Sequence, residues 1–305
     1  MKILIVGGGA MGLTHGALFS EAAEVSILVR SPDQADEINT KGIVNFESNK
    51  SFKIKAYSSI NELKNFNSYD YVVFTLKAYD IKPVTKEFIE IFGLRVMQNK
   101  NLVYIFNGMG VFEELESEFG FVNENTIAFI TGIAARRVEP NSFKISGTRA
   151  SVYGSLTKSN TDSLESVLEK LDHERIKSES TQLEVWKKFK RACVQNALSA
   201  ITAKTFGELA KYEDVNALLK LIIDEIDLVA SLEGFDLTNI AEDTFIDAWK
   251  NFVPKHYSSL HNDVVSGKRT EIDYLNGEII RLANNHNVRV PVNEMITHLT
   301  KIIEN

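Results

Sequence analysis

The stretch Met-Lys-Ile-Leu-Ile-Val-Gly-Gly-Gly-Ala-Met-Gly, residues 1–12, decides the fold of this chain. Its first half, Ile3–Val6, is a fully apolar run rich in β-branched residues, which is typical of a strand buried on both faces. Gly7, Gly9 and Gly12 follow at the G-x-G-x-x-G spacing, and the residues after them can continue as a helix. The stretch therefore predicts a strand, a glycine-rich turn and a helix.

Each glycine of this motif has a physical role. The first permits the tight turn, the second lets a pyrophosphate approach the backbone, and the third lets the helix pack closely on the strand. The helix N-terminus then presents N–H groups and the positive end of its dipole to phosphates. We predict a dinucleotide-binding turn built from Gly7, Gly9, Ala10, Met11 and Gly12; the alternative is a tight strand–helix turn without a ligand.

Arg30 indicates which dinucleotide is bound. It lies at the end of a second expected strand, 24–30, where NAD enzymes place an Asp or Glu that accepts hydrogen bonds from the ribose. This chain instead has a cation followed by the hydroxyl of Ser31, and the planar guanidinium of arginine can bind a phosphate with two donors. We predict NADP(H) rather than NAD(H); an ordinary solvated arginine is the alternative.

Composition bounds the class of protein. A chain of 305 residues, 44% hydrophobic and 25% charged, is long enough for two domains with cores of their own. The net charge of −7 argues against nucleic-acid binding, and the apolar runs are too short for a membrane span. The single cysteine excludes an intrachain disulfide, and the six histidines lack ligand spacing, so we expect no metal. We expect a cytoplasmic protein; the oligomeric state is left open, with a homodimer among the assemblies considered.

The order of the elements favours an α/β fold. Short apolar runs alternate with helical patterns in the first half, which predicts a Rossmann-type, doubly wound parallel sheet, and long helical periodicities dominate the second half. We predict a nucleotide-binding domain over 1–179 and an all-helical substrate and catalytic domain over 180–305. The expected strands beyond the first two are 71–76, 102–106, 126–130, 143–145 and 150–154, the last three added at the end of the sheet, and the expected helices are 183–202, 215–233, 240–252, 270–284 and one beginning near Pro291.

Two polar residues follow expected strands of the first domain. Lys77 comes after the strand at 71–76, and Asn107 comes after the strand at 102–106. In open α/β sheets ligands bind beyond the carboxyl ends of the strands. A lone Lys or Asn in a loop is usually only solvated, but this placement favours a role at the predicted cofactor site.

The helical half contains two stretches of interest. In the first, Lys188 and Asn196 share one helix face, and the neighbouring Lys187, Lys190 and Arg191 are interpreted as a solvated basic surface. The second is Thr270-Glu271-Ile272-Asp273, for which the simplest interpretation is a capping box with Thr270 as N-cap. By spacing alone, Glu271 would be only an acidic residue of a first helical turn.

Together these motifs resemble the ketopantoate reductase (2-dehydropantoate 2-reductase) family over nearly the whole chain. The resemblance implies an N-terminal Rossmann domain, a helical C-terminal domain, an active site between them, and hydride transfer from NADPH to ketopantoate to give D-pantoate for pantothenate synthesis. The matching segments are Gly7-Gly8-Gly9-Ala10-Met11-Gly12, Leu76-Lys77-Ala78, Asn107-Gly108, Trp186-Lys187-Lys188, Ser258-Ser259 with Asp263, and Thr270-Glu271-Ile272-Asp273.

The resemblance assigns roles residue by residue. Lys188 would be the catalytic lysine and Glu271 its acidic partner, because a positioned ammonium can stabilise the charge that hydride addition builds on a ketone oxygen and can donate the proton. The remaining assignments are Lys77 and Arg30 to the cofactor, Asn107 to both nicotinamide and substrate, and Asn196, Ser259 and Asp263 to the substrate. For Ser259 the alternative is a helix cap. Lys255 and Arg269 are both candidates for the cation that binds the substrate carboxylate.

Two departures from the family bear on the substrate. Ala192 stands where the family commonly has Asn, and a further Asn expected nearby corresponds to Phe206. Both changes would remove amide groups from the substrate side, where ketopantoate carries a hydroxyl. Two alternatives therefore stay open: a relative that reduces another branched or aromatic 2-oxo acid, and a non-catalytic module that senses NADP(H).

Overall fold

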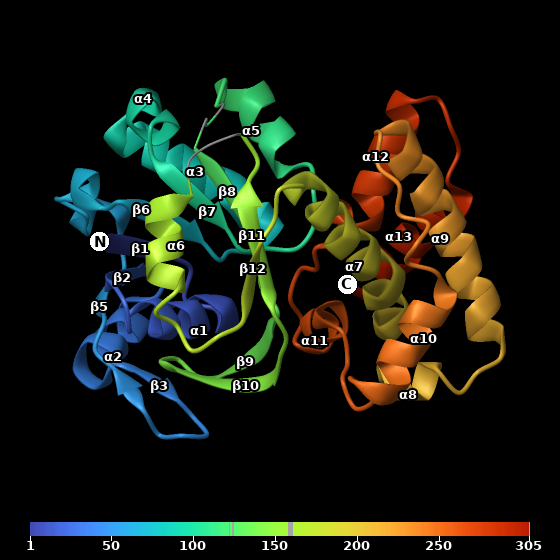
Figure 1. Cartoon of the computed structure of the whole chain (residues 1–305), viewed down its shortest axis with the longest axis horizontal. Coiled ribbons are helices and arrows are strands. Elements are labelled where there is room, and N and C mark those ends of the chain that lie inside the picture. The colour runs from blue at the N-terminus through green and yellow to red at the C-terminus, as the bar shows by residue number, and fades with distance from the viewer. Residues whose placement is uncertain (122, 124, 158–160, 305) are drawn as a thin grey trace. The chain divides into compact units, whose positions relative to one another are not determined.

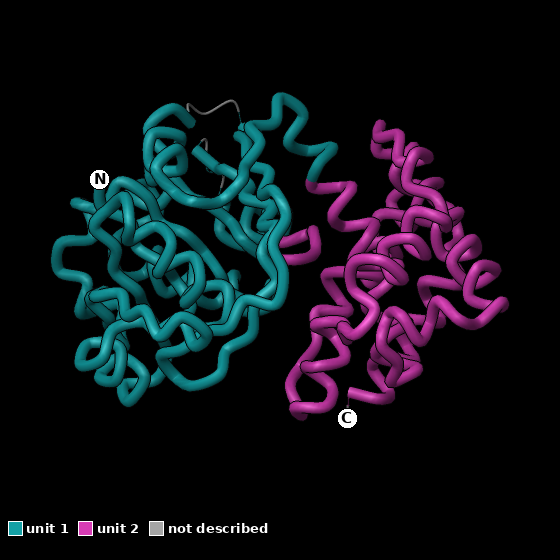
Figure 2. Tube along the Cα trace, turned by 60° about the horizontal axis from the view of Figure 1, so that its bottom comes forward, with its two compact units in different colours: residues 1–106, 112–184 teal, residues 107–111, 185–305 magenta. Residues whose placement is uncertain are grey.

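The computed structural model describes residues 1–121, 123, 125–157 and 161–304, and the chain separates into two compact units (Figure 2). Unit 1 comprises residues 1–106 and 112–184, and unit 2 comprises residues 107–111 and 185–305. The short segment 107–111 thus groups with the C-terminal helices rather than with the sheet it follows. The domain boundary at 179/180 stays a prediction.

Unit 1 is built on a mainly parallel sheet, which has eight strands within the described residues (Figure 1). The pairings from β5 through β8 are parallel, whereas β11 runs antiparallel to β8. The segment expected at 150–154 therefore forms the next-to-last strand of the sheet, and β12 forms its edge. The residues of β1 from Ile3 to Val6 are buried, in agreement with the prediction from their apolar run. In spatial order the strands are β12 (Arg175–Lys177), β11 (Ser151–Ser155), β8 (Thr126–Ile130), β7 (Asn101–Tyr104), β6 (Tyr71–Phe74), β1 (Lys2–Val6), β2 (Glu24–Leu28) and β5 (Lys55–Tyr57).

The order of the strands reverses at β1, which pairs with β2 on one side and β6 on the other. The chain leaves β1 through the glycine-rich turn into α1, so the predicted cofactor turn lies at the topological switch point, where ligands of such sheets bind. The helices of this unit are α1 (Ala10–Phe19), α2 (Pro32–Lys41), α3 (Ala78–Phe92), α4 (Leu94–Gln98), α5 (Val111–Phe119, whose first residue groups with unit 2) and α6 (Asp162–Leu168), with 3-10 turns at Ile60–Glu62 and Phe66–Ser68.

A second, smaller sheet lies against α1, and it contains the segment 143–145 that was expected in the main sheet. That expectation was wrong because β10 pairs with β9 across a tight hairpin and with β3, while α1 packs on β1 and β2 on one side and on β3, β9 and β10 on another. Its strands, in spatial order, are β4 (Ser51–Phe52), β3 (Ile43–Asn45), β10 (Ser142–Thr148) and β9 (Ile133–Glu139).

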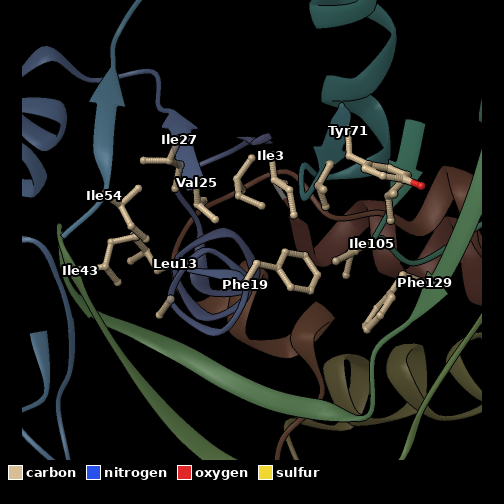
Figure 3. Close-up of a cluster of buried hydrophobic side chains, with 14 of the residues drawn as sticks. Ile3, Leu13, Phe19, Val25, Ile27, Ile43, Ile54, Tyr71, Ile105 and Phe129 are labelled. Carbon is tan, nitrogen blue, oxygen red and sulfur yellow. The ribbon is translucent and has the colours of Figure 1, made fainter. Parts of the chain in front are cut away.

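The core of unit 1 gathers around α1 (Figure 3). Leu13 and Phe19 of α1 are buried with strand residues such as Ile3 and Ile27, and Phe129 of β8 packs edge-on against Phe19. Each such side chain contributes roughly 1.5–3 kcal/mol through its burial. Because the apolar residues occupy both the strands and the helix, the glycine turn between β1 and α1 is held from both ends.

Unit 2 is helical, and its core is formed around α7. Trp186, Phe189 and Cys193 of α7 are buried, and Trp249 of α10 is fully enclosed. No helix in the described part of the chain combines the length and apolar character needed to cross a bilayer. The helices are α7 (Thr181–Thr202, which begins in unit 1), α8 (Phe206–Leu209), α9 (Asp214–Leu232), α10 (Glu242–Asn251), α11 (Ser259–Val265), α12 (Asn276–Asn285) and α13 (Pro291–Glu304), with a 3-10 turn, η3, at Ile272–Tyr274.

Candidate active site

The glycine-rich turn has the local geometry that its sequence predicts. Gly7 has φ +120°, a conformation that L side chains rarely adopt, and it is buried directly after β1. A Cβ on Gly12 would lie 1.8 Å from the carbonyl oxygen of Gly7, so the third glycine is required by the close contact between α1 and the turn. The backbone therefore demands a glycine at both positions.

Gly9 differs from the other two glycines. It is exposed, it is the N-cap of α1, and a Cβ there would meet no atom within 4 Å. The fold itself leaves room for a side chain at this position. The absence of a Cβ at Gly9 is therefore useful only to a ligand that approaches the backbone from outside the protein. Such a ligand would meet the first backbone N–H groups of α1, which have no partner within the helix.

Two residues that the sequence did not single out hold the middle of the turn. Gln34 is buried in the first turn of α2, and its Nε2 donates hydrogen bonds to the carbonyl oxygens of Gly8 (2.8 Å) and Pro140 (2.6 Å). Nη1 of Arg137, on β9, donates to the same Gly8 oxygen at 3.4 Å. Both contacts join residues far apart in the chain, so no local pattern could have revealed them.

The predicted cofactor side chains of unit 1 follow the carboxyl ends of its strands. Arg30 is exposed beyond β2, and the hydroxyl of Ser31 accepts a hydrogen bond from the backbone N–H of Gln34 (3.3 Å) as the N-cap of α2. Lys77 is half-buried after β6, at the N-cap of α3. The hydroxyl of Ser31 therefore already has a structural partner. Arg30 is the cationic side chain that lies at the carboxyl end of β2.

Asn107 lies in the segment that groups with unit 2, and the turn that follows α11 holds this segment in place. The backbone N–H of Met109 donates to the carbonyl oxygen of Tyr274 (3.0 Å). Gly108 has φ +95°, and a Cβ on it would lie 2.4 Å from that same oxygen. The fold thus places the residues after β7 against η3, the 3-10 turn that begins directly after Glu271.

Lys188 and Glu271 interact within unit 2. Burial lowers the pKa of Lys188 from 10.5 to about 8, and the negative charge of Glu271 opposes that shift by favouring the ammonium form. Glu271 is itself only 3% exposed. A half-buried lysine beside a buried carboxylate can hold a proton at neutral pH and release it readily, which is the property a general acid needs.

The capping box expected at Thr270 is absent, and that interpretation was wrong. The helix that follows begins only at Asn276, and the hydroxyl of Thr270 accepts from the backbone N–H of Ile272 (3.3 Å) within the turn. The backbone N–H and hydroxyl of Thr270 both donate to the carboxylate of Glu304, at 3.1 and 2.7 Å. Glu304 of α13 thus bonds to Thr270 in place of the nearby acidic residue that a capping box would use.

Two of the predicted substrate residues, Ser259 and Asp263, lie on α11, and the start of this helix is bonded to the backbone of a third, Asn196. Ser258, not Ser259, is the N-cap of α11, since the Oγ atom of Ser258 accepts from the backbone N–H of His261 (3.0 Å). The same hydroxyl donates to the carbonyl oxygen of Asn196 (2.9 Å), so the start of α11 is fixed to α7. The cap interpretation of Ser259 was therefore wrong: this residue is exposed in the first turn, and Asp263 is half-buried near the end of the same helix.

One further interpretation of the helical half, that of Lys190, is corrected by the structure. Lys190 is fully buried rather than solvated, and its Nζ donates to Oδ1 of Asp227 (2.6 Å) and to the carbonyl oxygen of Leu237 (2.9 Å). Phe206 is buried, and its ring stacks on Trp249 with centroids 5.5 Å apart. A ring held in this way belongs to the core of unit 2.

The two candidate cations for a carboxylate are placed as follows. Lys255 is exposed, and Arg269 is exposed and lies 3.5 Å from the carboxylate of Asp273. Ala192 is buried on α7, one helical turn after Lys188. The choice between Lys255 and Arg269 stays open.

A Rossmann-type sheet with a glycine-rich turn at its switch point, followed in the chain by a helical unit in which a half-buried lysine interacts with a buried glutamate, is typical of a nucleotide-binding oxidoreductase. Residues 3–158 match the family model described as Ketopantoate reductase PanE/ApbA, and residues 180–304 match that of its C-terminal part. The chain belongs to the ketopantoate reductase family, and the resemblance drawn from the sequence is confirmed.

Similar proteins agree with this assignment over their full lengths. The chain is 25% identical over 308 residues to a 2-dehydropantoate 2-reductase of Pyrococcus horikoshii, covering 100% of this chain and 98% of that protein. A PanE/ApbA family ketopantoate reductase of Ralstonia eutropha matches with a TM-score of 0.83 and 25% identity, covering 100% and 98% of the two chains. A D-mandelate dehydrogenase solved with NADH shares the fold, with a TM-score of 0.84, 22% identity and coverage of 100% and 99%.

Proposed function

We propose that this chain catalyses the NADPH-dependent reduction of 2-dehydropantoate (ketopantoate) to D-pantoate, a step of pantothenate biosynthesis. Family models for both parts of the chain and full-length relatives named 2-dehydropantoate 2-reductase support the reaction. The single structural observation that supports it best is the interaction of Lys188 with the buried Glu271. This pair is the proposed catalytic centre.

A nicotinamide dinucleotide fits the glycine-rich turn. The open space at Gly9 and the N-terminus of α1 suit a pyrophosphate that approaches the backbone, and Gly7 and Gly12 maintain the turn. When bound, the cofactor supplies the hydride. We assign the cofactor to Gly7, Gly9, Ala10, Met11, Gly12, Arg30, Lys77 and Asn107.

Arg30 is the basis for proposing NADPH rather than NADH. Its exposed guanidinium stands beyond β2, where a carboxylate would repel a 2′-phosphate. A charge-assisted hydrogen bond to such a phosphate contributes roughly 1.5–3 kcal/mol. We therefore expect the catalytic efficiency with NADPH to exceed that with NADH by about 10-fold or more.

Lys188 supplies the proton in the proposed reaction. Hydride addition to the ketone builds negative charge on its oxygen, which the ammonium of Lys188 stabilises and then protonates. With a pKa of about 8, this lysine is mainly protonated at neutral pH, and the charge of Glu271 favours that form. Asn107, Asn196, Ser259 and Asp263 are proposed to orient the substrate.

A second candidate substrate class follows from Ala192. This buried methyl group cannot hydrogen-bond a substrate hydroxyl, and the ring of Phe206 packs against Trp249. Losing one such partner costs roughly 1–3 kcal/mol, which corresponds to about 5- to 150-fold in kcat/KM. The same chemistry on another branched or aromatic 2-oxo acid is therefore the alternative.

An NADPH-oxidation screen over a panel of 2-oxo acids tests these proposals. We expect turnover with ketopantoate at a higher kcat/KM than with the hydroxyl-free analogue 2-oxoisovalerate. A preference for the analogue would favour the second substrate class. Tight NADPH binding without turnover on any member of the panel would favour a cofactor-sensing module. A cytoplasmic location stays a prediction, and the oligomeric state stays open.

A further inference from the structure

The turn that carries Glu271 is fixed to the last helix by two polar links. The carboxylate of Glu304 accepts hydrogen bonds from the backbone N–H (3.1 Å) and the hydroxyl (2.7 Å) of Thr270. Three residues further along the turn, Asp273 pairs with Lys301 (2.5 Å), one turn earlier in α13. Thr270 precedes Glu271 in the turn and Asp273 follows it, so α13 bonds to the turn on both sides of Glu271.

The two links differ in their surroundings. Thr270 is only 2% exposed, and its hydrogen bonds to the half-buried Glu304 are therefore partly shielded from water. The side chains of Asp273 and Lys301 are 42% and 48% exposed, and exposed ion pairs of this kind contribute little. The carboxylate of Glu304 is thus the stronger of the two restraints.

The hydroxyl of Thr270 connects Glu304 to the backbone on the far side of Glu271. It donates to Glu304 and accepts from the backbone N–H of Ile272 at 3.3 Å, so the residues before and after Glu271 are tied to one carboxylate. Glu271 is buried between them and interacts with Lys188 of α7. The charged side chains on the turn itself are Arg269 and Asp273, and those of α13 that bond to the turn are Lys301 and Glu304. The charge that acts on Lys188 is that of Glu271.

Resting on the function proposed above, we propose that Glu304 is a positioning residue for the reduction: its carboxylate fixes the turn at Thr270 so that the carboxylate of Glu271 stays against the ammonium of Lys188. Glu304 touches neither reacting atoms nor cofactor in this role. It acts through Thr270 on Glu271, and through Glu271 on the proton that Lys188 holds.

The expected effect follows from how the pair works. A displacement of about 1 Å at a catalytic group can cost on the order of 100-fold in rate, so a partly released turn should lower kcat by ~10-fold or more. The KM for NADPH should stay unchanged. Because Glu271 raises the pKa of Lys188 against the effect of burial, moving this carboxylate away should lower that pKa further. The alkaline limb of the kcat profile would then shift to lower pH.

Four variants test the proposal in the full-length protein. Glu304→Ala removes the carboxylate, and Thr270→Val removes the hydroxyl while keeping the shape, which preserves the test if Glu304→Ala does not fold. Glu304→Gln retains an acceptor and a donor and should recover part of the lost kcat. Glu294→Ala is the control, because it removes a carboxylate of α13 that pairs with Arg289 (3.3 Å) away from the turn.

Two readouts separate positioning from a general loss of stability. The first is the pH profile of kcat with the best 2-oxo acid of the panel. The second is the pKa of Lys188, followed by NMR in protein with 13C-labelled lysine and assigned with Lys188→Arg. We expect the alkaline limb of the kcat profile and the pKa of Lys188 to move to lower pH in Glu304→Ala and Thr270→Val. Glu271→Gln, which removes the charge of Glu271 itself, serves as the reference for the direction of this shift. Neither quantity should change in Glu294→Ala.

The possible results are distinguishable. Wild-type kcat and an unchanged pKa of Lys188 in both Glu304→Ala and Thr270→Val would overturn the positioning role. If the wild-type chain reduced no 2-oxo acid while the pKa of Lys188 still moved in these variants, the proposed function would fail, and only the positioning of Glu271 by Glu304 would stand.

Discussion

Replacing Lys188 with Met should change how the stability of this protein depends on pH. Burial lowers the pKa of Lys188 from 10.5 to about 8 in the folded chain. Between those pH values the unfolded chain binds more protons than the folded one, so the free energy of unfolding of the wild type rises with pH. Burial of the Lys188 ammonium therefore destabilises the folded chain. This destabilisation is fully present below about pH 8 and is lost as the pH rises through the unfolded-state pKa of about 10.4.

The size of this effect follows from the shift. A lowering from 10.5 to about 8, at about 1.4 kcal/mol per pKa unit, corresponds to roughly 3 kcal/mol. Methionine has a similar length and no charge, so the variant lacks this contribution. It also leaves the carboxylate of Glu271 buried without its cation, which offsets part of any stability gained at neutral pH. The pH dependence is therefore a cleaner readout than the stability at one pH.

The assay is denaturant unfolding of wild type and Lys188→Met at several pH values from about 7 to about 11. We expect the wild type to gain roughly 3 kcal/mol relative to the variant across this range. Lys86→Met, at a lysine whose side chain is 56% exposed, should show no such change. A difference between wild type and Lys188→Met that stays constant with pH would refute the reasoning about burial.

Five further substitutions, one of them a control, probe the cofactor site and the helical core. Gly9→Ala should leave the free energy of unfolding unchanged and weaken NADPH binding ~10-fold or more, whereas Gly12→Ala, whose Cβ would lie 1.8 Å from a backbone oxygen, should destabilise by roughly 1–3 kcal/mol. Cofactor titration and denaturant unfolding measure both effects, and equal loss of stability in the two variants would contradict the account. Arg30→Gln should lower kcat/KM for NADPH by about 10- to 100-fold and spare NADH; comparable efficiencies with both cofactors in the wild type would contradict the assignment. Lys190→Met should destabilise by about 3 kcal/mol because it leaves a partly buried aspartate 2.6 Å away without its cation, whereas Lys220→Met, at an exposed pair, should cost far less in the same unfolding assay; similar costs would show that Lys190 is not a core residue in solution.

Local patterns predicted the central strands of the main sheet and its glycine-rich turn, but not the second sheet, to which residues 143–145 belong. The apolar run Ile3–Val6 forms a strand whose four residues are buried, and Gly12 is required by the contact that its spacing implied. These features depend on residues within one strand–turn–helix unit, where backbone geometry and hydrophobic periodicity leave few alternatives. The family resemblance was recognisable for the same reason, since its motifs are short and contiguous.

The errors came from contacts between distant residues. Lys190 stands in a basic run, yet its partner Asp227 is 37 residues away, and only the packing of α7 on α9 turns this ammonium inward. Thr270 has the spacing of a capping box, but Glu304, 34 residues away, supplies a carboxylate instead. Neither pairing leaves a periodic signal in the sequence. The catalytic roles of Lys188 and Glu271 were predicted only from the family resemblance.

The most direct test of the central claim is the pH dependence of ketopantoate reduction by NADPH in wild type and Lys188→Ala. We expect the wild-type kcat to fall as the pH rises above about 8, where Lys188 loses its proton. The variant should turn over at least ~100-fold more slowly, with NADPH affinity retained and without this alkaline limb. Near-normal turnover in Lys188→Ala, with the same pH profile as the wild type, would contradict the assignment of Lys188 as the proton donor.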